Sequence, residues 1–169
     1  LNQFRHQWGR SIVDGFKYFQ DDGSIEIITC GATHGYFPLL ATDESVQAQV
    51  KVAVDAYKRR FGRAPRGIWM PECAYRPHYE WSAPGSGEKP WPRKGVDEFL
   101  LENGIEYTFV DSHLIRGGEP LGTYWQKFPH LAEYFARSRK LFTQPREFRS
   151  EYEHYALESG LTVFARDPE

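Results

Sequence analysis

An acidic residue that follows a short apolar segment is the strongest candidate for chemistry in this sequence. Residues 68–70, Ile-Trp-Met, form the kind of apolar run that makes a buried strand. Pro71 ends that strand because it has no N–H to donate, so Glu72 follows at the strand's C-terminal end. Ligands and catalytic groups collect at that end in α/β sheets. Glu72 could act as a nucleophile, a base or a metal ligand, or it could be an exposed acid paired with Arg76.

Three other predicted strands also end in polar residues. His34 follows the first strand, Asp111 and His113 follow the third, and Asp167 follows the fourth. Because the carboxyl ends of parallel strands share one edge of a sheet, we expect these side chains to gather near Glu72. Taken singly, His34 could be a hydrogen-bonded structural group. Asp111 could orient an Arg or His side chain, and we expect His113 to be structural.

The elements that would position these residues alternate between helix and strand. An apolar stripe predicts one amphipathic helix over residues 4–19, ended near Gly23. Further helices are predicted over 43–61, capped by Thr42 and ended by Gly62, and around 96–102. Strands are predicted at 25–30, 68–70, 107–110 and 161–165. Residues 76–94 are predicted to form a loop, and the pattern over 117–159 is ambiguous. The buried face of the long helix is predicted to contain Val46, Val50, Ala53, Val54, Tyr57 and Phe61.

This alternation predicts an α/β fold with a parallel sheet built from right-handed crossover units. A length of 169 residues indicates one domain or a large piece of one. The net charge of −2 gives no general attraction to nucleic acid or to an anionic membrane, and no apolar run approaches the ~20 residues of a membrane span. Two cysteines make no disulfide scaffold, so a reducing, cytoplasmic setting is the default.

Three segments closely resemble sequence blocks of glycoside hydrolase family 57: Cys30–Pro38, Trp69–Pro77 and Phe109–Leu114. Two others, Lys94–Leu100 and Val163–Pro168, look most like the 1,4-α-glucan (glycogen) branching enzymes of that family. The resemblance runs nearly from end to end. It implies a (β/α)7 barrel, a retaining mechanism and no metal or other cofactor.

The resemblance also implies roles for individual residues. Glu72 corresponds to the family's catalytic nucleophile, and His34 lines the subsite of the reacting sugar. With α-1,4-glucan as the substrate, we expect further substrate contacts from Trp69, Tyr75, Arg76, Trp81 and Asp111.

Two family blocks have no counterpart in these residues. One is the His-containing block of the opening strand, and the other is the later block that carries the Asp acting as general acid/base. We therefore expect residues 1–169 to form the central part of a single catalytic barrel, lacking the opening strand and the later acid/base segment. Such a piece would be inactive alone and would depend on the remainder of its own chain.

The implied reaction makes physical demands on these residues. A retaining glycosidase places two carboxyl groups about 5–5.5 Å apart, one to attack the anomeric carbon and one to protonate the leaving oxygen. A cation such as Arg76 would favour an ionised Glu72. Branching also needs a glucan 6-hydroxyl in place of water. Rings of the 75–91 loop, such as Tyr79 and Trp81, could stack on sugar and exclude water, or they could merely hold the loop on the barrel.

Alternative functions stay open at this point. Cys30, His34, Cys73 and His78 could supply a two-Cys, two-His zinc set. A non-catalytic carbohydrate-binding fragment would keep the aromatic residues without needing Glu72. An amylase or a 4-α-glucanotransferase of the same family would use the same nucleophile. The first test is whether Glu72 lies in a pocket within reach of His34 or points into solvent.

Overall fold

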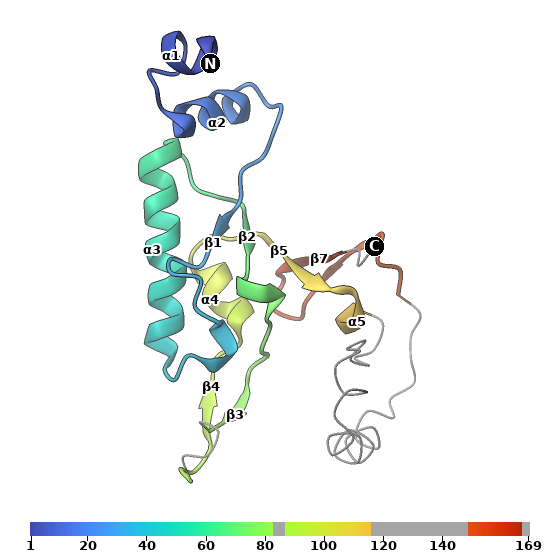
Figure 1. Cartoon of the computed structure of the whole chain (residues 1–169). Helices are drawn as coiled ribbons and strands as arrows, with labels where there is room; N and C mark the ends of the chain where they lie inside the picture. The colour runs from blue at the N-terminus through green and yellow to red at the C-terminus, as the bar shows by residue number, and fades with distance from the viewer. Residues whose placement is uncertain (83–86, 116–148, 167–169) are drawn as a thin grey trace, which may run out of the picture.

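The computed structural model describes residues 1–82, 87–115 and 149–166 (Figure 1). Asp167 and most of the ambiguous 117–159 segment lie outside the described residues, as does the side chain of His113. In chain order, the elements are α1 Asn2–His6, α2 Ile12–Asp21, β1 Thr29–Cys30, the 3-10 turn η1 Phe37–Leu39, α3 Asp43–Phe61, β2 Gly67–Trp69, the 3-10 turn η2 Pro71–Cys73, β3 Tyr79–Trp81, β4 Trp91–Arg93, α4 Val96–Glu102, β5 Tyr107–Asp111, α5 Ser112–Ile115, β6 His154–Ala156 and β7 Thr162–Arg166.

The main sheet has five strands in the order β1-β2-β5-β7-β6. The pairs β1–β2, β2–β5 and β5–β7 are parallel, which confirms the predicted parallel strands of a mixed α/β fold. The fifth strand, β6, pairs antiparallel with β7 and was not predicted. The turn between them closes with a hydrogen bond from Leu157 N to Leu161 O (2.9 Å) and uses Gly160 at φ 94°.

Helix α3 has the predicted ends and the predicted buried face. The Thr42 hydroxyl accepts a hydrogen bond from Ser45 N (3.2 Å), and Gly62 ends the helix in the left-handed conformation at φ 75°. Five of the six predicted face residues are buried, and Phe61 is half-buried. Figure 1 shows α3 running alongside β1 and β2. The core joins α3 and α4 to one face of the sheet, with members such as Val50, Val54, Ile68, Phe99, Val110 and Val163.

The predicted single N-terminal helix is wrong, because the chain forms α1 and α2 with a break between them. Gly9 and Arg10 have φ values of 54° and 67°, outside the helical region. Ser11 then caps α2, accepting a hydrogen bond from Asp14 N (3.1 Å). The apolar stripe is also not fully buried, since Ile12 and Phe16 are exposed. Within the described part of the chain, every helix is too short or too polar to cross a bilayer.

The predicted first strand over 25–30 is reduced to the two residues of β1. Main-chain groups just before β1 form hydrogen bonds with side chains and not with a neighbouring strand. Ile27 N donates to Gln20 Oε1 (2.9 Å), and the Tyr57 hydroxyl lies 2.8 Å from Ile27 O. These contacts to α2 and α3 occupy groups that a longer strand would have paired.

The segment predicted as a loop over 76–94 contains the antiparallel hairpin β3–β4. Its anchor is Arg93, whose side chain is fully buried. The Arg93 guanidinium donates from Nε to Asp43 Oδ1 (2.7 Å) and from Nη1 to Leu40 O (2.7 Å). It also lies over the Trp81 ring, 4.7 Å from the ring centroid. One buried cation therefore fixes the hairpin to the first turn of α3.

Replacing Asp43 with Ala tests this anchor. The change leaves the Arg93 cation buried without its carboxylate, so the free energy of unfolding should fall by about 2–3 kcal/mol. Asp55→Ala, on the same helix, is the control, because Asp55 pairs with the exposed Lys51 (3.3 Å) and such a pair contributes about 0–1 kcal/mol. Urea denaturation of the full-length protein measures both, and equal losses would contradict the anchor.

Candidate active site

His34 and Glu72 meet at the carboxyl ends of neighbouring parallel strands, as predicted. His34 lies in the loop after β1, and Glu72 lies in η2, directly after β2. His34 Nε2 is 3.2 Å from Glu72 Oε1. The other ring nitrogen, Nδ1, is 3.1 Å from the Sγ atom of Cys30, the last residue of β1. A thiol, an imidazole and a carboxyl group thus form one hydrogen-bonded row.

The backbone at this row is in a sparsely populated conformation. His34, Glu72 and Cys73 have φ values of 57°, 58° and 51°, and none of them is glycine. Such left-handed residues cost free energy, and they cluster at functional sites, where the surrounding structure holds them. Here the turn is held by hydrogen bonds from Cys73 N to Met70 O (2.9 Å) and from Ala74 N to Pro71 O (3.2 Å).

Gln49 of α3 holds the His34 loop. Its side chain accepts a hydrogen bond from Thr33 N (2.9 Å) and donates one to Thr33 Oγ1 (2.7 Å). The main-chain carbonyl oxygen of Gln49 accepts a hydrogen bond from Ala32 N (3.1 Å). Sequence reasoning missed this role, because a polar residue beside the buried face of a helix carries no local signal of a distant partner. It grouped Cys30 with His34 only as candidate zinc ligands and did not predict their direct contact.

Of the alternatives considered for Glu72, pairing with Arg76 is not what the described residues show, because Glu72 contacts His34 instead. Arg76 is only 2% exposed and donates one long hydrogen bond, from Nη1 to Pro77 O (3.4 Å). Burial lowers the pKa of Arg76, and the nearby Arg93 cation lowers it further. The Glu72 side chain is 71% exposed and that of His34 is 52% exposed. Glu72 is therefore within reach of His34, but in an open setting.

The third predicted strand end lies beside this row. Asp111 Oδ1 is 2.8 Å from Arg166 Nη2 across the β5–β7 pair, which agrees with the orienting role considered for Asp111.

The Cys73 thiol is buried. Burial raises the pKa of Cys73 to about 11, and the negative charges of Asp111 and Glu72 contribute to the rise. Cys73 therefore stays protonated at neutral pH, between the ends of β2 and β5.

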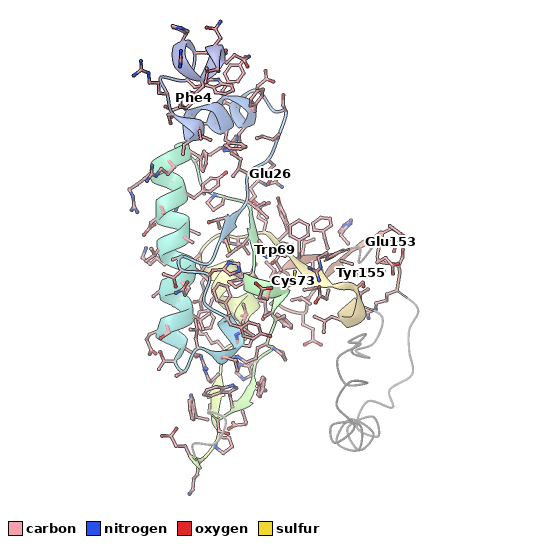
Figure 2. All side chains as sticks on the ribbon, in the orientation of Figure 1. Phe4, Glu26, Trp69, Cys73, Glu153 and Tyr155 are labelled. Atoms are coloured by element: carbon pink, nitrogen blue, oxygen red, sulfur yellow. The ribbon has the colours of Figure 1, made fainter. Side chains whose placement is uncertain are left out.

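Aromatic side chains occupy the sheet face opposite the core. Trp69, Phe109 and Phe164 form a row across β2, β5 and β7, with ring centroids 5.9 Å apart at each step. Figure 2 shows Trp69 and Cys73 near the centre of the molecule, on β2 and the turn after it. Trp69, a predicted substrate contact, is thus on the strand that leads to Glu72.

Two other predicted substrate contacts are engaged with protein groups. The Tyr75 hydroxyl donates to Asp97 Oδ1 (3.2 Å), and burial raises the pKa of Tyr75, with the Asp97 charge adding to the rise. Trp81 is 6% exposed and packs edge-on against Trp91, with centroids 5.1 Å apart. In contrast, Tyr79 is 42% exposed and its ring lies 5.6 Å from the Arg76 guanidinium.

The described residues do not gather all four proposed zinc ligands, although Cys30 and His34 are in contact. His78 Nδ1 lies 3.5 Å from Glu98 Oε1, while both nitrogens of His34 are occupied by Cys30 and Glu72. Across residues 1–82, 87–115 and 149–166, no group of three or more His, Cys, Asp or Glu side chains is arranged to hold a metal ion. The zinc hypothesis therefore gains no support from the geometry.

The whole chain, residues 1–169, matches the model of glycosyl hydrolase family 57. The chain belongs to this family. It is 40% identical, over 175 aligned positions, to a 1,4-alpha-glucan branching enzyme of Thermococcus kodakarensis, covering 100% of this chain and 24% of the relative. The crystal structure of a branching enzyme of this family from Pyrococcus horikoshii superposes with a TM-score of 0.72 at 42% identity, covering 94% of this chain and 24% of that one.

An alpha-amylase structure from Thermotoga maritima is also similar, with a TM-score of 0.65 at 32% identity over 99% of this chain and 24% of that one. The chain thus spans about a quarter of the length of these relatives. The predicted family and fold class are confirmed. The mostly parallel sheet matches family 57 enzymes, which have a (β/α)7 barrel fold.

Gly31, at the start of the His34 loop, offers a test of how tightly this family 57 site is packed. A Cβ atom on Gly31 would lie 2.9 Å from the buried Phe37 ring and 3.1 Å from Pro71 Cγ. Gly31→Ala should therefore lower the free energy of unfolding by about 1–3 kcal/mol. Gly35→Ala in the same loop should cost much less, since its Cβ would meet Gln49 at an ordinary 3.5 Å. Denaturant titrations of the full-length protein measure both, and a Gly31→Ala loss no larger than that of the control would disprove the tight packing.

Proposed function

We propose that these residues form the central part of the catalytic barrel of a retaining 1,4-α-glucan branching enzyme, with Glu72 as its nucleophile. The observation that carries the proposal is the contact of Glu72 with His34 on a strained backbone at the carboxyl ends of β1 and β2. The names of the relatives at 40% and 42% identity support branching over other α-glucan chemistry. On this proposal, the general acid/base lies outside residues 1–169.

The first step of the proposed reaction uses an ionised Glu72. Among the described residues, His34 contacts Glu72 through Oε1, which leaves Oε2 to attack the anomeric carbon of an α-1,4-linked glucan. The bond from that carbon to O4 of the leaving chain breaks, and the general acid protonates the leaving oxygen. A covalent glycosyl-enzyme on Glu72 results. The exposed position of Glu72 suits a polymeric substrate that approaches from solvent.

The second step distinguishes branching from hydrolysis. A glucan 6-hydroxyl attacks the anomeric carbon, gives its proton to the general base and releases Glu72 as a carboxylate. We propose that Trp69 and the exposed Tyr79 contact sugar directly, because sugar C–H faces stack on flat rings. Tyr75, Arg76 and Trp81 would act by holding the hairpin, and Asp111 by orienting Arg166 at the edge of the site. A role in glycogen biosynthesis and a cytoplasmic setting are parts of the same proposal.

Amylolysis is the second candidate, because the T. maritima alpha-amylase shares 32% identity and nearly the full span of this chain. It would use the same glycosyl-enzyme but end with water as the acceptor. Product analysis separates the two. Branching shifts the iodine complex of amylose and creates α-1,6 linkages, whereas amylolysis releases reducing ends.

Replacing Glu72 with Gln in the full-length enzyme tests the nucleophile. The substitution preserves shape and removes the attacking charge, so kcat should fall by about 10³-fold or more while glucan binding is retained. Glu158→Gln is the matched control, since Glu158 is exposed in the turn before β7, away from the carboxyl ends of the strands. Iodine staining of amylose measures turnover, and near-normal activity of Glu72→Gln would refute the assignment.

Replacing Tyr79 with Ala tests the hairpin as a sugar-binding surface. Because Tyr79 is partly exposed, its loss should weaken glucan binding by about 1 kcal/mol and raise the ratio of hydrolysis to transfer. The melting temperature should hardly change. Trp81→Ala removes the buried ring against Arg93 and should instead lower stability by about 3 kcal/mol. An unchanged product ratio with Tyr79→Ala would show that the hairpin serves only the fold.

A further inference from the structure

We propose that Cys30 is a positioning residue that selects the tautomer of His34 and, through it, fixes the Glu72 carboxylate for attack. The inference rests on the proposed function, in which Glu72 is the nucleophile. Its basis is the row of contacts from Cys30 Sγ to His34 Nδ1 (3.1 Å) and from His34 Nε2 to Glu72 Oε1 (3.2 Å). Cys30 does not touch the sugar in this arrangement.

The Cys30 thiol is in its protonated form, which can donate a hydrogen bond. Cys30 is half-buried, and burial raises its pKa. The nearby Glu72 charge also raises it, against a lowering contribution from the backbone N–H of Gly31. A neutral S–H group is a weak donor that points its single proton at one acceptor. The structure places the imidazole Nδ1 atom 3.1 Å from Sγ, where it can accept this proton.

The two partners of His34 determine which ring nitrogen carries the proton. An ionised carboxylate can only accept hydrogen bonds, so the contact with Glu72 requires a proton on Nε2. If Nδ1 accepts from the thiol, the ring carries that one proton and is neutral. In the opposite tautomer, an unprotonated Nε2 would face the lone pairs of Glu72, and the Nδ1 proton would have only the weakly accepting sulfur of Cys30 as its partner. Cys30 therefore favours the one neutral form in which His34 donates to Glu72.

The strand structure makes Cys30 a fixed reference point. Cys30 pairs with Trp69 in the β1–β2 register, whereas His34 lies on a loop held by Gln49. A neutral N–H holds Glu72 Oε1 in place with less charge withdrawal than an imidazolium would, so Oε2 keeps more of its nucleophilic character. Among the described residues, the Asp111–Arg166 pair is also close enough to influence the pKa of Cys73.

The test compares Cys30→Ala with Cys30→Ser in the full-length enzyme. A serine hydroxyl can donate to Nδ1, and alanine cannot. We expect kcat on amylose to fall about 10–100-fold in the alanine variant, with KM within about twofold, because a wrong histidine tautomer impairs the chemical step more than binding. The serine variant should retain kcat within about threefold. If the alanine variant does not fold, Cys30→Val fills the volume without supplying a donor.

Rescue of kcat by serine but not by valine is the readout that a packing defect would not produce, because only serine restores a donor to Nδ1. A kcat within twofold of wild type for Cys30→Ala, or equal losses in both variants, would overturn the inference.

These outcomes are separable from a failure of the proposed function. Glu72→Gln reports on the nucleophile itself. An inactive Glu72→Gln enzyme together with a fully active Cys30→Ala enzyme would reject the positioning role alone. An active Glu72→Gln enzyme would reject the nucleophile and, with it, this inference.

Discussion

The candidate site depends on the parallel pairing of β1 with β2, in which Cys30 lies opposite Trp69. Side chains alternate between the two faces of a sheet, so a shift of one residue would turn Cys30 to the other face. In the observed register, both strands end at the same edge, and the chain reaches His34 and Glu72 within a few residues of that edge. Continuity of this register with β5 and β7 brings the Asp111–Arg166 pair beside them. One pattern of backbone hydrogen bonds thus places groups from four separate segments.

The strain at the site is supported by packing directly behind it. Glu72 and Cys73 take left-handed φ values without being glycine, which costs on the order of 1–3 kcal/mol for each residue. The residues on either side are buried: Met70 and Pro71 before the turn, and Ala74 after it. Gly31 packs against Phe37 and Pro71 because it has no Cβ. The side chain of the proposed nucleophile is therefore exposed, while packing and hydrogen bonds hold its backbone.

The sequence predicted the parallel strands, α3, α4 and the meeting of His34 with Glu72, because those features follow from local patterns and from the rule that parallel strands share a carboxyl edge. It did not predict the β3–β4 hairpin. Pro90 and Pro92 argue for a loop, while the stabilising contact of Arg93 with Asp43 joins residues 50 positions apart. It also missed the helix break at Gly9 and Arg10, because the helical spacing of apolar residues continues across these two positions. The thiol contact of Cys30 depends on side-chain placement that spacing alone does not define.

The two faces of the sheet carry different kinds of side chain. Buried positions of alternate residues, such as Ile68, Val110 and Val163, pack against α3 and α4. The residues between them carry the aromatic row of Trp69, Phe109 and Phe164 on the opposite face, where Phe164 is 37% exposed. In the proposed barrel, the face opposite the helices is the interior, which side chains from the strands fill. The aromatic row therefore lies inside the proposed barrel, and Trp69 joins it to the strand that leads to Glu72 at the carboxyl end.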